Sequence, residues 1–214
     1  MKVRAAIITG VVLAAGVAGV SQAAAPKKVC KLLIDATGDG EFLVPGNDAS
    51  LDIVSADIAS STKTITGVIR VSKYAATDVG APMGRVWYVQ FVAPGYTKPL
   101  WMSVGIDPVL GATYEYGFLD TLASGNGSYE AIDGAPAATG KIDVAKNELR
   151  VHVPVAGYAL LKANVKPGAV FKSMTSTSTA LIGVLGGGVV ATVDEATTKK
   201  TYKAGAPSCV AVGK

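Results

Sequence analysis

Histidine, cysteine and charged residues are scarce in this chain of 214 residues, and each shortage excludes a class of protein. Two cysteines and one histidine are too few for a zinc ribbon or a disulfide-dense miniprotein. Only 17% of the residues are charged while 50% are hydrophobic, so the composition is not that of a disordered chain. No phosphate-binding glycine loop and no nucleophile elbow occurs. With 25 glycines, the composition favours an all-β protein that contains many turns.

The first residues have the pattern of an export signal. Lys2 and Arg4 precede an uncharged run over residues 5–20, and residues 21–23 offer the small side chains that signal peptidase requires. A retained membrane anchor is the alternative, but this run is short for a span of roughly 20 residues. We therefore expect a cleaved signal peptide over 1–23, a secreted product without a transmembrane anchor, and one domain over 24–214.

The charge of the mature chain is nearly balanced. Without Lys2 and Arg4, 18 of the 20 basic residues remain against 16 acidic residues, which gives a net charge of +2. Short basic clusters occur only near the two ends, at 27–31 and 199–203, and they are typical of solvated ends. A nucleic-acid partner would need a basic face with stacking aromatic residues, so we expect no such partner.

Cys30 and Cys209 lie near the two ends of the mature chain. In an exported protein, an even pair of cysteines most simply forms a disulfide bond. Loop entropy would give such a long closure about 5 kcal/mol of stabilisation at most. The bond would also make the first and last strands neighbours.

Alternation of apolar and polar residues with period two dominates the chain, and turn sequences separate the alternating runs. The expected strands are 29–35, 51–58, 63–71, 86–92, 100–106, 113–119, 128–132, 140–144, 148–153, 169–176, 188–193 and 201–203. Many short strands at this spacing predict an antiparallel, jelly-roll-like β-sandwich of one domain. The uncharged stretch 180–193 is expected to form two short buried strands joined at its glycines, with an exposed loop as the alternative.

The single histidine bears on catalysis. A Ser-His-Asp or Cys-His site needs an imidazole beside a nucleophile in a pocket. Here His152 lies in mid-strand with Glu148 and Arg150, on a polar face that we expect to be solvated, opposite three aliphatic residues. Two carboxylates alone can hydrolyse a glycoside, so a small carboxylate-dependent hydrolase remains an alternative. We expect a protein that is not an enzyme.

The acidic residues are unevenly placed, with six of the sixteen between Asp35 and Asp57. Calcium prefers carboxylate and carbonyl oxygens, and the turn-rich segment 35–41 offers both. The spacing is not that of an EF-hand, and aspartate and glycine also form turns without any ion. Asp35 and Asp39 are the candidate calcium ligands.

The aromatic residues are also concentrated, with ten of fourteen between Tyr74 and Tyr129. Four of them are candidates for a platform that stacks on sugar rings: Trp87, Trp101, Tyr114 and Tyr116. Alternation places Trp101 on the face opposite to its aliphatic neighbours. The alternative is that these rings fill the interior of the sandwich.

Several short motifs together resemble a known group of proteins. They are Asp35-Ala-Thr-Gly-Asp39 and the segments 51–58, 65–71, 138–143, 149–154 and 202–209. The chain resembles a group of secreted actinobacterial proteins and is more distantly similar to the DOMON domain and to carbohydrate-binding module family 9. This resemblance implies a noncatalytic β-sandwich with calcium near the first acidic turn, and a sugar or haem ligand in some relatives. His152 on a strand surface does not match a haem-ligand pair.

The sequence therefore predicts an exported, noncatalytic β-sandwich module that binds an extracellular carbohydrate. The alternative is a structural or interaction protein of the cell envelope that has no small-molecule ligand.

Overall fold

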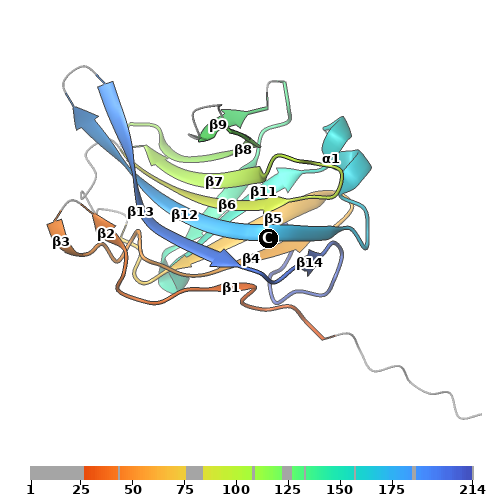
Figure 1. Cartoon of the computed structure of the whole chain (residues 1–214), viewed down its shortest axis with the longest axis horizontal. Coiled ribbons are helices and arrows are strands. Elements are labelled where there is room, and N and C mark those ends of the chain that lie inside the picture. The colour runs from red at the N-terminus through yellow and green to blue at the C-terminus, as the bar shows by residue number, and fades with distance from the viewer. Residues whose placement is uncertain are drawn as a thin grey trace, which may run out of the picture.

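Two antiparallel sheets pack against each other in this computed structural model, so the predicted all-β sandwich is confirmed (Figure 1). The structure describes residues 27–213 except 43, 76–83, 108, 122–126, 133, 157 and 185–186. The predicted signal peptide and its cleavage site lie outside the described residues.

The smaller sheet has five strands. From edge to edge they are β1 (Leu33–Ile34), β4 (Ile53–Ser60), β5 (Thr64–Val71), β11 (Glu148–Pro154) and β10 (Thr139–Asp143). Hairpins join β4 to β5 and β10 to β11, and the second of these turns through a 3-10 helix over Val144–Lys146. Asn147 ends that helix in the left-handed conformation, as expected for a residue that tolerates positive φ.

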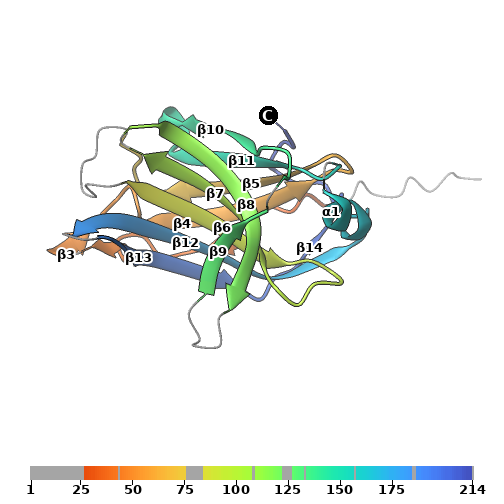
Figure 2. The ribbon, with the colours of Figure 1, turned by 90° about the horizontal axis from the view of Figure 1, so that it is seen from above.

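The larger sheet has seven strands. In order they are β13 (Gly187–Thr198), β12 (Val170–Val184), β6 (Arg85–Val92), β7 (Leu100–Asp107), β8 (Gly111–Thr121) and β9 (Gly127–Ala131), with β14 (Tyr202–Lys203) paired to β12. A separate ribbon pairs β2 (Glu41–Phe42) with β3 (Val44–Asn47). Figure 2 shows β8 and β9 in front of the other strands, curving across them near the middle of the view.

The long hairpin of β12 and β13 extends beyond the predicted strands. Its residues Thr175 to Thr179 alternate threonine and serine, and β-branched threonine suits an extended backbone, so pairing continues where no apolar pattern predicted it. The prediction of two strands within 180–193 is confirmed, but their burial is only partial. Ala180 is buried and Val190 is exposed.

One short helix, α1 (Ala159–Asn164), was not predicted and lies at one end of the sandwich (Figure 2). Leu161 is fully buried and anchors the helix, and a hydrogen bond from the Val165 amide to the Leu161 carbonyl ends it. No helix in the described part of the chain is long and apolar enough to cross a membrane.

The core lies between the inner faces of the two sheets. Its largest fully buried side chains include Trp87, Phe91, Ile58 and Ile69. Gly67 on β5 allows the closest approach, because a Cβ there would lie 2.9 Å from the sulfur of Met102 on β7. A side chain at this position would force the end of the Met102 side chain to move, and close-packed interiors leave little room for such a change.

The predicted disulfide bond between Cys30 and Cys209 is confirmed, with 5.1 Å between the two Cα atoms. The chain segments beside it also pair. The Val29 amide donates to the Pro207 carbonyl at 2.8 Å, and the Cys209 amide donates to the Val29 carbonyl at 3.0 Å. The first and last segments of the described chain are therefore neighbours, as the pairing of the cysteines implied.

Candidate metal centre

The acidic loop between β1 and β2 is held in place by Asp52. The amide of Gly38 donates to Asp52 Oδ2 at 2.8 Å, and Gly38 has φ of +93°, which favours glycine. Gly40 lies so close to Asp52 that a Cβ on it would be 2.9 Å from the Asp52 Cα. These contacts fix the turn that presents Asp39.

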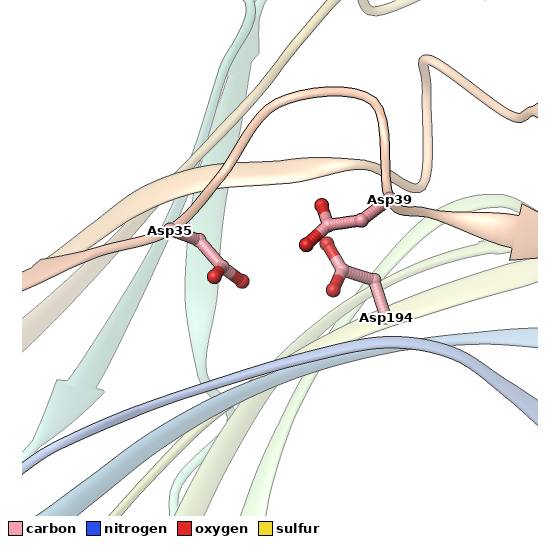
Figure 3. A group of neighbouring side chains, drawn as sticks. All are labelled: Asp35, Asp39 and Asp194. Atoms are coloured by element: carbon pink, nitrogen blue, oxygen red, sulfur yellow. The ribbon is translucent and has the colours of Figure 1, made fainter.

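Three carboxylates converge beside this loop. One oxygen each from Asp35, Asp39 and Asp194 lies within 4.8 Å of the others, as Figure 3 shows from the side. Asp35 follows β1 of the smaller sheet, and its amide continues the pairing with β4 by donating to the Val54 carbonyl at 3.0 Å. Asp194 comes from β13 of the larger sheet, so the cluster spans the edge where the two sheets meet.

Asp194 was missed by sequence reasoning. The predicted strand ended at Val193, and Asp194 lies far along the chain from the acidic loop. Only the pairing of the two sheets brings it to Asp35 and Asp39. The available signal was a charged residue directly after an apolar strand pattern. If such a residue is buried, it is seldom left without a partner.

The raised pKa values of Asp35 and Asp194 show that their ionised forms are disfavoured in this cluster. Burial, followed by the nearby carboxylates of Asp35 and Asp39, raises the pKa of Asp194 to about 6, although the amides of Ile53 and Glu195 act in the opposite direction. Asp194 is only 7% exposed, and its Oδ2 accepts from the Ile53 amide at 2.6 Å. Burial also raises the pKa of Asp35, with Asp39 and Asp52 adding to the effect.

One oxygen of Asp35 marks the centre as incompletely satisfied. Its Oδ1 accepts from the Ala36 amide at 3.0 Å, but its Oδ2 is buried without a hydrogen-bond partner among the described residues. Buried polar atoms nearly always have a partner, so this oxygen has room for a proton, a cation or a hydrogen-bond donor such as water.

The donor set fits calcium. All three candidate ligands are carboxylates, and calcium takes hard oxygen ligands at about 2.3–2.6 Å in flexible geometry. Two oxygens on opposite sides of such an ion lie about 4.6–5.2 Å apart. Oxygens that all lie within 4.8 Å of one another can therefore reach a single ion.

Three of the four rings predicted to form a platform for sugars are buried, namely Trp87, Trp101 and Tyr116, and the fourth, Tyr114, is half-buried. Trp87 lies in the core, where its Nε1 donates to the Ser50 carbonyl at 3.0 Å. Tyr116 is buried, and its hydroxyl donates to the Pro136 carbonyl at 2.9 Å. Tyr114 is half-buried and packs against Gly140, where a Cβ would meet its ring.

Trp101 lies on the outer face of the larger sheet, as alternation predicted, but it is only 2% exposed. Its ring meets the edge of Tyr88 at 5.9 Å between centroids, and on the neighbouring strands it stands opposite Gln90 and Gly117. A ring covered in this way offers no face for a sugar to stack on.

His152 belongs to the structure of the smaller sheet. Its Nδ1 lies 3.0 Å from the Thr66 hydroxyl, and burial together with Arg150 lowers its pKa. Glu148 on the same face was expected to be solvated, but it is buried between two arginines. Arg70 Nε donates to it at 3.0 Å and Arg150 Nε at 2.6 Å.

No protein-family model matches this chain, and a search of curated proteins finds no similar sequence.

Proposed function

We propose that the protein is an exported, noncatalytic β-sandwich module that binds a calcium ion through Asp35, Asp39 and Asp194. The convergence of these three carboxylates is the observation that carries the proposal. The buried, unpartnered oxygen of Asp35 and the raised pKa of Asp194 support it. A bound cation would give the Asp35 oxygen a partner and would favour the ionised form of Asp194.

Calcium would join the two sheets at one edge. Asp35 and Asp39 belong to the loop beside β1, while Asp194 belongs to β13. An ion bound to all three stabilises the folded state, because the unfolded chain does not hold these residues together. Extracellular calcium modules commonly have dissociation constants of about 10⁻⁴–10⁻³ M. A disulfide bond that closes most of the chain fits the same oxidising compartment.

The resemblance to secreted actinobacterial β-sandwich proteins supports a noncatalytic role. An extracellular carbohydrate remains the proposed ligand, at a place other than the four aromatic residues named above. A cell-envelope interaction protein is the alternative. A hydrolase would use two carboxylates, whereas a metal ion accounts for all three and for the unpartnered oxygen.

Thermal unfolding with calcium, with magnesium and with chelator tests the calcium site. At about 10 mM calcium, the dissociation constants above give about 1.4–2.7 kcal/mol of stabilisation, or a rise of about 3–10 °C in Tm. Magnesium demands shorter, more regular coordination, and we expect a smaller rise.

Asp39→Asn is the test variant, because Asp39 is exposed and its loss should leave the fold intact. Glu195→Gln is the matched control, since it removes one charge from the residue next to Asp194 on the opposite face of β13. We expect the calcium shift to be lost in Asp39→Asn and kept in Glu195→Gln. An absence of any shift in the wild type, or equal shifts in both variants, would overturn the proposal.

A further inference from the structure

Eleven exposed lysines gather at the end of the sandwich that carries α1 and β14, and we name this surface the lysine end. They are Lys27, Lys28, Lys31, Lys63, Lys98, Lys162, Lys166, Lys172, Lys199, Lys200 and Lys203. The segments that carry them, 27–32, 59–64, 93–100, 155–172 and 198–213, contain no aspartate or glutamate. Basic groups that are scattered along the sequence therefore gather on one positively charged surface.

Contacts between these segments confirm that they share one end. Lys200 Nζ donates to the Lys31 carbonyl at 3.4 Å, which joins the end of β13 to the N-terminal segment. The Val155 amide donates to the Lys63 carbonyl at 2.8 Å, which joins β11 to the turn between β4 and β5. Figure 1 shows α1 and β14 at one end, with β2 and β3 beside the acidic loop at the other.

A groove of about 590 Å³ opens within the lysine end. One wall is the chain after β6, from Val92 to Tyr96, and the other runs from Gly168 to Lys172 at the start of β12. The stem of Lys203 lies against Gly168, 3.6 Å from the position a Cβ would take there. Lysines thus lie both in the groove and along its rim.

Tyr96 gives the groove an aromatic wall. Its ring stacks on Phe118, with 5.0 Å between centroids and 25° between the planes, and this contact holds it in place. It is partly exposed, unlike the buried Trp87 and Trp101. A fixed, partly exposed ring offers an apolar surface against which the C–H groups of a sugar can pack.

The chemistry of these cations points to a diffuse anionic partner. Lysine acts as a flexible point charge, whereas arginine recognises carboxylate or phosphate in a fixed bidentate geometry. Arg70 and Arg150 are instead bonded to buried acids in the smaller sheet, and Arg85 is buried. The lysine end therefore suits recognition of the overall negative charge of a ligand, and not of one group held in a fixed geometry.

We infer that the lysine end binds an acidic polysaccharide, with the chain in the groove beside Tyr96 and its carboxylates on the surrounding lysines. The groove fits a linear polymer better than it fits a flat lipid surface. Among the described residues of this end, Val170 is the only large hydrophobic side chain that is clearly exposed, so little is available for insertion into a bilayer. The groove is lined by residues 92–96 and 168–172, none of which belongs to the carboxylate centre, so binding in it does not depend on calcium.

The test is binding of polygalacturonate, a linear polymer of uronic acid, in chelator and at low salt. The chelator prevents calcium from bridging the polymer to the acidic loop. A loss of polysaccharide binding under these conditions therefore says nothing against the calcium site, and the two proposals can fail separately. The triple variant Lys166→Gln, Lys172→Gln, Lys203→Gln removes three charges around the groove. The matched control, Lys73→Gln, Lys141→Gln, Lys146→Gln, removes three from exposed lysines elsewhere.

We expect the groove variant to lose affinity about tenfold or more and to show a shallower salt dependence, while the control stays close to wild type. Unfolding of both variants at the temperature of the wild type shows that the fold is intact. Equal affinities of the two variants would overturn the inference, as would equal binding of a neutral glucan. Stronger binding to single-stranded DNA or to anionic lipid vesicles than to polygalacturonate would also overturn it.

Discussion

Replacing Asp194 by Asn should stabilise the calcium-free protein at neutral pH. The carboxyl of Asp194 has a pKa of about 6 in the folded state against 3.8 for an ordinary aspartate, because it is buried beside Asp35 and Asp39. Its ionised form is therefore disfavoured by folding. The shift corresponds to about 3 kcal/mol at 1.36 kcal/mol per pH unit, and solvent screening places the effect at about 1–3 kcal/mol.

The direction of the pH dependence follows from this raised pKa. Asp194 contributes stability fully below its unfolded pKa, and that contribution is lost as the pH rises through about 6. Asparagine does not titrate, and its amide oxygen can still accept from the Ile53 amide that Asp194 now bonds at 2.6 Å. The two proteins should therefore differ little near pH 4 and diverge by pH 7.

Thermal unfolding from pH 4 to pH 8 in chelator measures this difference. The variant should unfold about 2–12 °C above the wild type at pH 7, since 1 kcal/mol shifts Tm by about 2–4 °C for a chain of this size. Subtracting the two profiles cancels the contribution of His152, which titrates in both. A variant less stable than wild type at pH 7, or a difference independent of pH, would refute the reasoning. Added calcium should reverse the order, because only the wild type keeps the ligand.

Three further predictions concern stability. Replacing Cys30 and Cys209 by serine should cost about 5 kcal/mol at most, and unchanged denaturant unfolding would contradict the stabilising role of the bond. Trp101→Ala should cost about 3–5 kcal/mol and leave polygalacturonate binding to the folded protein unchanged; weakened binding would return Trp101 to the ligand site. Arg70→Met should cost about 2–4 kcal/mol in urea unfolding because it removes the arginine bonded to the buried carboxylate of Asp57 and leaves Glu148 with Arg150 alone, and an unchanged free energy of unfolding would contradict this reasoning.

Much of the fold follows from the sequence because each strand carries its own pattern. In β11, alternation correctly placed Leu149 in the core and His152 on the outer face. Glu148 was misjudged, since whether a polar face is solvated depends on its neighbours across the sheet. Here Arg70 of β5 and Arg150 of β11 enclose it.

The candidate site could be predicted only where its residues lie close in sequence. Asp35 and Asp39 are four residues apart and were recognised together, whereas Asp194 reaches them only through the pairing of the two sheets. Periodicity also could not tell which aromatic residues were exposed. Trp101 is buried by residues of the two neighbouring strands, and the local sequence does not show which strands will be its neighbours.

The lysine end shows the same limit. Its lysines occur in five separate segments, and in sequence each segment looks like an ordinary solvated turn or end. Because strands of a sandwich run back and forth between two ends, turns far apart in sequence meet there. A charge pattern of this kind becomes visible only when the strand order is known.

The closure between Cys30 and Cys209 also determines how the molecule bears mechanical load. The chain enters and leaves the sandwich at this bond, and β1 to β14 lie within the loop that it closes. Tension applied to the chain after Cys209 first acts on Val210 and Gly213, which contact the smaller sheet, and then passes through the two sulfur atoms. The strands inside the closed loop should therefore carry no load until the bond is reduced, after which the force reaches them.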